Sequence, residues 1–185
     1  MTPRVTPLLA LVLAGCLASQ LDTMKDRQAA GDLPALAATP VDCSGPDPVC
    51  AQAQTLRAEA CLRLGQHACA EAGYAAALAA LPTTAPASQR RVVLAGLAAA
   101  AMARRDAGQA SPDAQLAAGM ALLALDPSDP IGCTHARSAR LALALLGPAG
   151  PARCAELAAA PACAANPALD RQIAAQSAAC RSIAP

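Results

Sequence analysis

The sequence has almost no aromatic residues. Tyr74 is the only one, because the 185 residues contain neither tryptophan nor phenylalanine. Apolar residues make up 55% of the chain, but many of them are alanines, which favour helices and bury little area each. A core of alanine and leucine gains less from burial than one with aromatic anchors. We therefore expect covalent cross-links to contribute to the stability of the fold.

Several other patterns are missing as well. Strand-like alternation of apolar and polar residues is absent and β-branched residues are scarce, so we predict an all-α fold. The formal net charge is only +1, which excludes the broad basic surface typical of nucleic-acid binding. After residue 16, no run is long and apolar enough to cross a membrane without proline, glycine or charge.

The chain offers little for catalysis or metal binding. Its two histidines, His67 and His135, each lie two residues from a cysteine, but the paired C-x-x-C spacing of a structural zinc site is missing. No local motif places a nucleophile beside a base. Glu59 and Glu71 belong to different predicted helices, and we expect both to face solvent. The sequence therefore predicts no catalytic residue, no cofactor and no metal site.

The first sixteen residues follow a recognisable order. Arg4 precedes an unbroken apolar run, Leu8 to Leu13, and two small residues then lead into Cys16. The apolar run is too short to span a bilayer. This order resembles a bacterial lipoprotein signal peptide with its lipobox. The resemblance implies cleavage before Cys16, acylation of Cys16 and, with Leu17 following, anchoring at the periplasmic face of the outer membrane. An apolar helix with a chance cysteine is the alternative.

The cysteine count agrees with lipidation. Nine cysteines are an odd number, and assigning Cys16 to lipid leaves eight, which in a small exported chain are typical of a disulfide framework. Bridged Cα atoms lie within about 7 Å, and a helix rises about 1.5 Å per residue. Cys50 and Cys61, far apart on one predicted helix, therefore cannot pair, whereas Cys61 and Cys69 lie on either side of a turn and can.

Applied to the remaining cysteines, the same reasoning favours one set of pairs out of 105. These pairs are Cys43–Cys50, Cys61–Cys69, Cys133–Cys163 and Cys154–Cys180. A bridge between Cys154 and Cys163 is the alternative, and it would require a sharp bend at Pro161.

Proline, glycine and capping residues divide the chain into segments. We predict a signal peptide over 1–15, a lipidated tether with one short helix over 16–46, and a helical domain over 47–185. The helices expected in that domain cover about 48–64, 67–81, 88–106, 112–126, 133–146, 152–160 and 167–180.

One hairpin has a more specific pattern. The order and spacing of seven residues resemble one tetratricopeptide repeat: Ala58, Gly65, Ala70, Tyr74, Ala77, Leu78 and Pro82. A weaker match ends at Pro127, although Gly119 stands where that motif has an aromatic residue. The resemblance implies antiparallel helical hairpins stacked in a short α-solenoid. An unrelated disulfide-linked helical bundle is the alternative.

Together these features predict a membrane-anchored periplasmic lipoprotein that acts as a protein–protein interaction adaptor or scaffold in the cell envelope. The lipid on Cys16 would hold it to the membrane, and the helical-repeat surface would bind a protein or peptide. The arginine pairs at 90–91 and 104–105 form either a solvated face or a contact for an acidic partner or lipid headgroups. Two alternatives remain: an enzyme or ligand-binding domain with a site assembled from distant residues, and a purely structural envelope lipoprotein.

Overall fold

The computed structural model describes residues 8–148, 150–164 and 166–181, and within these ranges the fold is all-helical with no strand. The chain divides into two compact units, residues 1–85 (unit 1) and 86–185 (unit 2). None of the helices in the described part combines the length and apolarity needed to cross a membrane. The helices, and the absence of strands among the described residues, confirm the predicted all-α class.

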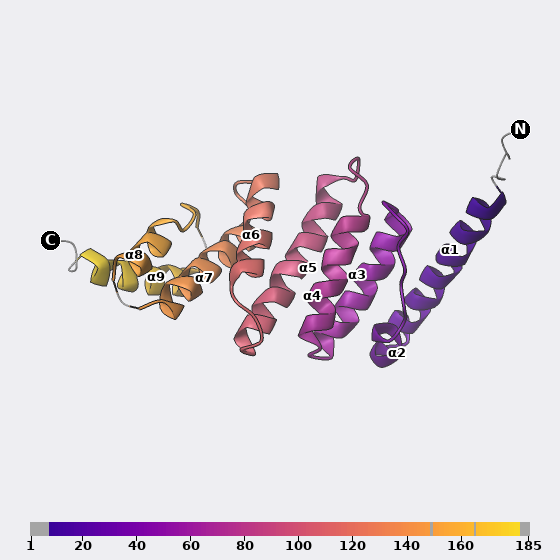
Figure 1. Cartoon of the computed structure of the whole chain (residues 1–185), viewed down its shortest axis with the longest axis horizontal. Helices are drawn as coiled ribbons and strands as arrows, with labels where there is room; N and C mark the ends of the chain where they lie inside the picture. The colour runs from indigo at the N-terminus through magenta and orange to yellow at the C-terminus, as the bar shows by residue number, and fades with distance from the viewer. Residues whose placement is uncertain (1–7, 149, 165, 182–185) are drawn as a thin grey trace, which may run out of the picture. The chain divides into compact units, whose positions relative to one another are not determined.

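Unit 1 contains four helices in its described part (Figure 1): α1 (Leu8–Ala29), α2 (Leu33–Ala37), α3 (Pro48–Arg63) and α4 (His67–Ala80). The start of α3 is set by Asp47, whose carboxylate accepts hydrogen bonds from the backbone N–H groups of Val49 and Cys50. Pro48 occupies the first helical position, where no N–H is needed. Gly65 adopts a φ of +71°, which turns the chain so that α4 packs against α3.

The segment expected to be a tether, residues 16–46, is largely helical and packed. Both α1 and α2 contact α3, and Leu21, Met24 and Leu36 are buried. Gly31 and Pro34 lie within this segment and are residues typical of irregular structure. In the structure Gly31 turns the chain between the two helices with a φ of +72°, and Pro34 lies in the first turn of α2, where proline is tolerated.

Small residues set the approach of α3 to α4. A Cβ atom added at Gly73 would lie 2.9 Å from the Cβ atom of Ala58, so no larger residue fits there without movement. Ala70 is also fully buried. Tyr74 is buried too, and its pKa is raised to about 12, first by burial and then by the negative charge of Glu59.

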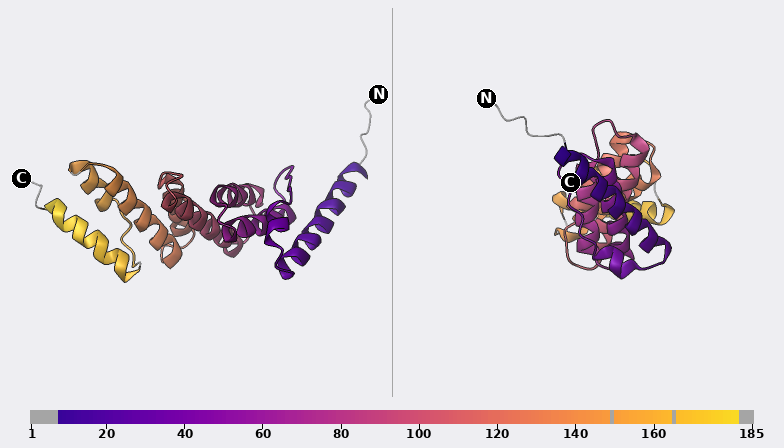
Figure 2. Two further views of the ribbon diagram at one scale, coloured as in Figure 1. Left: turned by 90° about the horizontal axis from the view of Figure 1, so that it is seen from below. Right: turned by 90° about the vertical axis from the view of Figure 1, so that its right-hand side faces the viewer.

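The described helices of unit 2 are α5 (Ala87–Asp106), α6 (Asp113–Leu125), α7 (Pro130–Leu146), α8 (Pro151–Ala158) and α9 (Pro167–Arg181). α6 packs against α5 and α7, and α9, the yellow helix in Figure 2, packs against α7 and α8. The helix predicted from Cys133 begins three residues earlier. The carboxylate of Asp129 accepts hydrogen bonds from the N–H groups of Ile131 and Gly132, and Pro130 again occupies the first position.

The start of α6 also differs from the expectation. The helix expected from about 112 begins at Asp113, and the hydroxyl group of Ser111 donates to the carboxylate of Asp113 at 2.7 Å instead of capping the helix. The first turn therefore has no side-chain cap. The remaining predicted helices of the region agree with the structure to within about two residues.

Four disulfides link the described cysteines, two in each unit, and they are the four pairs that helix geometry favoured. Their Cα atoms lie 5.6–6.0 Å apart. Cys154 bonds to Cys180, so the alternative bridge to Cys163 is not formed. Cys16, predicted to carry lipid, has a side chain that lies outside the described part of the structure.

Candidate functional site

Unit 2 contains an apolar groove of about 580 Å³ between α7, α9 and the end of α5. The C-terminal half of α7 is rich in leucine, and Leu141 and Leu145 are four residues apart, so they lie on one face of the helix. Leu145 and Leu146, adjacent residues at the end of α7, are 50% and 73% exposed. The residues that line the groove (called here the α7 groove) include Arg105, Ser138, Leu141, Ala142, Leu145, Leu146, Leu169 and Gln172.

A network of polar side chains joins three helices at one end of the α7 groove. Arg105 Nη1 donates to Gln115 Oε1 at 2.7 Å and to Ser138 Oγ at 3.1 Å, while its Nη2 donates to Asp106 Oδ1 at 2.5 Å. Gln115 is fully buried, and its Nε2 lies 3.3 Å from His135 Nδ1. The guanidinium of Arg105 is therefore held in place at the rim of the groove.

In the arginine pair at 90–91, Arg91 also forms an interaction within the fold. Arg91 forms an ion pair with the buried carboxylate of Asp129. Burial by itself raises the pKa of Asp129, but hydrogen bonds from Gly132 and Arg91 and the charge of Arg91 lower it below the usual range. Arg91 and Arg105 thus connect helices of unit 2, and neither forms part of a simple solvated face.

Burial lowers the pKa of His135, and the positive charge of Arg105 lowers it further. The unfolded chain, with an ordinary pKa near 6.5, then binds a proton more readily than the folded chain does. The stabilising contribution of neutral His135 is fully present above about pH 6.5 and is lost as the pH falls below it. The groups that face His135 are Gln115 from α6 and Arg105 from α5.

We predict that His135→Asn reduces the loss of stability between pH 7.5 and 5.5, because asparagine keeps a polar group near Gln115 without titrating. Urea titrations followed by circular dichroism at both pH values measure the effect. Ala117→Asn, at an exposed position of α6, is the matched control and should leave the pH dependence of the wild type unchanged. An identical pH dependence in His135→Asn and wild type would contradict the prediction.

The histidines and glutamates considered above for catalysis are distributed over both units. His67 and His135 belong to different units, and the described residues contain no group of three or more histidine, cysteine or carboxylate side chains arranged to hold a metal ion. Glu59, expected to face solvent, is half-buried and accepts a hydrogen bond from Gln28 Nε2 at 3.3 Å. Burial raises its pKa, against the opposing effect of Arg63.

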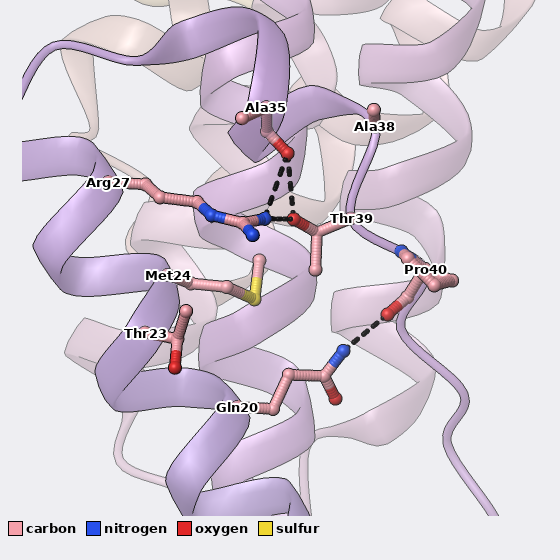
Figure 3. Close-up of a pocket in the computed structure, with 8 residues that line it drawn as sticks. All are labelled: Gln20, Thr23, Met24, Arg27, Ala35, Ala38, Thr39 and Pro40. Carbon is pink, nitrogen blue, oxygen red and sulfur yellow. Dashed lines mark hydrogen bonds between the residues drawn. The ribbon is translucent and has the colours of Figure 1, made fainter.

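A second cavity, which we call the Arg27 pocket, lies in unit 1 between α1 and the chain that follows α2 (Figure 3). Its volume is about 350 Å³. Arg27 Nη1 donates to the carbonyl oxygen of Ala35 at 3.2 Å and to Thr39 Oγ1 at 2.7 Å, and Gln20 Nε2 donates to the carbonyl oxygen of Pro40 at 2.5 Å. The pocket was not predicted, because residues 16–46 were expected to form a tether. The sequence does contain one signal for this pocket. Gln20 and Arg27 are seven residues apart, a spacing that places both on the same face of a helix.

No protein-family model, no curated protein and no solved structure matches this chain.

Proposed function

We propose that the chain is a lipid-anchored helical adaptor of the periplasm, without enzymatic activity, that binds a partner protein of the cell envelope. The observation that carries the proposal is the cysteine arrangement. Eight of the nine cysteines form disulfides within the two units, which fits an oxidising compartment. The cysteine left over is Cys16, the residue that the lipobox pattern would acylate.

The α7 groove is the surface that we assign to the partner. Contiguous exposed apolar surface commonly marks a site of protein interaction, and Leu145 and Leu146 supply it here. Residues 86–185 contain nine arginines, no lysine and six carboxylates, a balance of +3. A cationic unit with an apolar groove fits an apolar segment that has acidic residues on either side. The proposal includes the tetratricopeptide-like stacking of the hairpins, since such arrays bind peptide segments.

The lipid anchor has a direct test. We predict that the wild-type chain incorporates a fatty-acid analogue when it is expressed in an enterobacterial host, and that Cys16→Ser incorporates none, because the serine hydroxyl does not replace the thiol in the modification. Gel electrophoresis of labelled membranes measures incorporation. Cys43→Ala with Cys50→Ala, which removes a disulfide and keeps the lipobox, is the control and should label fully. Equal labelling of Cys16→Ser and wild type would refute the lipid anchor.

The partner surface is tested with a photo-crosslinking amino acid in place of Leu146, irradiated in native membranes. The matched control places the same amino acid at Leu64, which is 37% exposed on unit 1. We expect an adduct at position 146 and none at 64, with a partner that contains an acidic-flanked apolar segment. A synthetic peptide of that segment should compete with the adduct. An adduct pattern identical at both positions, or no competition by the peptide, would reject the α7 groove as the binding site.

A further inference from the structure

The Arg27 pocket has a charge of one sign. Of the described residues that line it, Arg27 is the only charged one, and the others are polar or apolar: Gln20, Thr23, Met24, Ala35, Ala38, Thr39 and Pro40. Asp22 and Asp26 lie on the same helix but do not line the cavity. We propose that this pocket binds an oxyanion, the phosphate or carboxylate group of a small ligand or of a lipid headgroup.

The donors in the pocket are fixed in orientation before any ligand arrives. Arg27 Nη1 is held by Ala35 and Thr39, which leaves the N–H groups at Nε and Nη2 without a partner in the described part of the chain. Figure 3 shows the guanidinium extending from α1 toward the chain after α2, with the Gln20 amide on the same side. A planar guanidinium binds phosphate or carboxylate through two parallel hydrogen bonds, and one N–H of Gln20 remains available beside it.

The two threonines make a different contribution. Thr23 Oγ1 donates to the carbonyl oxygen of Ser19 at 3.0 Å, and Thr39 Oγ1 donates to that of Ala35 at 2.8 Å. Both hydroxyl hydrogens are therefore occupied, and the two oxygens offer only lone pairs. An oxyanion must bind through Arg27 and Gln20, while a hydroxyl or protonated oxygen of the same ligand can donate to a threonine. A phosphate ester of glycerol has both kinds of group.

The remaining lining residues limit the size of the ligand, and the nearness of the pocket to Cys16 along α1 bears on the source of the ligand. Met24 and Ala38 present apolar surface, and about 350 Å³ exceeds the space needed by a phosphate group alone, so a short organic portion fits beside the anion. Gln20 follows Cys16 by four residues, about 6 Å along α1. With the lipid anchor proposed above, a phospholipid headgroup is one source of the phosphate, and a soluble phosphate ester is the other.

The test uses the full chain and two arms. In the first, glycerol 3-phosphate is titrated into the protein in nonionic detergent by calorimetry, with glycerol as the uncharged comparison. We expect saturable binding of glycerol 3-phosphate only, and a Kd at least tenfold higher in Arg27→Gln, a change of about 1.4 kcal/mol. Gln20→Met, which keeps Arg27 and its contacts with α2, should weaken binding by about threefold, or roughly 0.6 kcal/mol. Arg63→Gln, an exposed position outside the pocket, should bind as wild type does.

The second arm follows the Nε–H signal of Arg27 by NMR in lipid nanodiscs of phosphatidylcholine with and without phosphatidylglycerol. A shift with phosphatidylglycerol that glycerol 3-phosphate does not produce assigns the site to a lipid headgroup, whereas binding of glycerol 3-phosphate assigns it to a soluble ester. Absence of an effect of either probe on the wild type, or equal binding by wild type and a folded Arg27→Gln, overturns the proposal. Failure of the fatty-acid label at Cys16 would leave the first arm unaffected.

Discussion

The C-terminal half of unit 2 is expected to unfold when both of its disulfides are removed by changing Cys133, Cys163, Cys154 and Cys180 to alanine. The two bonds close loops with sequence separations of 30 and 26 residues. Constraint of the unfolded chain by loops of this length contributes about 3.5 kcal/mol each, or roughly 7 kcal/mol together. Because a whole domain is stable by only about 5–15 kcal/mol, this loss approaches the total.

The apolar core of this region cannot replace the disulfides. Its buried members are Leu141, Ala144, Leu157 and Ile173, and none is aromatic. Arg137 donates to the carbonyl oxygens of Pro161 and Cys163 and pairs with Asp170, but partly exposed ion pairs contribute only about 0–1 kcal/mol. The covalent bonds therefore supply a large share of what holds α8 and α9 to α7.

Circular dichroism during urea titration measures the loss. The control removes the two disulfides of unit 1, whose sequence separations are 7 and 8 residues, so each is expected to contribute about 2.5 kcal/mol. The variant of unit 2 should therefore show the larger loss of helix at low urea. If the variant of unit 2 retains its full helix content at a urea concentration that unfolds the variant of unit 1, loop length does not determine the stabilisation.

Local signals explain why the helices after residue 47 and the disulfide pairs could be predicted from the sequence. Asp47 and Pro48 define the start of α3 by hydrogen bonding and by a fixed φ, both of which operate within a few residues. Gly65 supplies the positive φ that brings Cys61 and Cys69 together. These inferences needed only the geometry of helices that follow one another in the sequence and of the turns between them.

Packing between helices was much harder to predict. Leu21 and Met24 are ordinary apolar residues in a charged segment, and they are buried because α1 packs against α2 and α3. The candidate sites depend on the same kind of contact. Gln115 and His135 are 20 residues apart and meet because α6 packs on α7, whereas Arg27 lines a cavity because α2 folds back along α1. No short motif encodes either arrangement.

The closest of these contacts gives the last prediction. A Cβ atom added at Gly119 on α6 would lie 2.6 Å from the backbone nitrogen of Ala136 and 3.1 Å from the carbonyl oxygen of Gly132, both on α7. These are backbone atoms of α7, so they cannot move as a flexible side chain can. The approach of α7 therefore leaves no space for a large side chain at position 119.

We expect Gly119→Leu to reduce the free energy of unfolding by about 3 kcal/mol, at the upper end of the usual cost of overpacking. The gain in helix propensity from replacing glycine, about 1 kcal/mol, opposes this loss without cancelling it. Ala117→Leu is the matched control, because position 117 is exposed on the same helix, and its stability should stay within about 0.5 kcal/mol of wild type. Thermal unfolding followed by circular dichroism measures both variants. An equal Tm for Gly119→Leu and Ala117→Leu would mean that α6 and α7 do not approach through this glycine, and it would remove the basis for placing Gln115 beside His135.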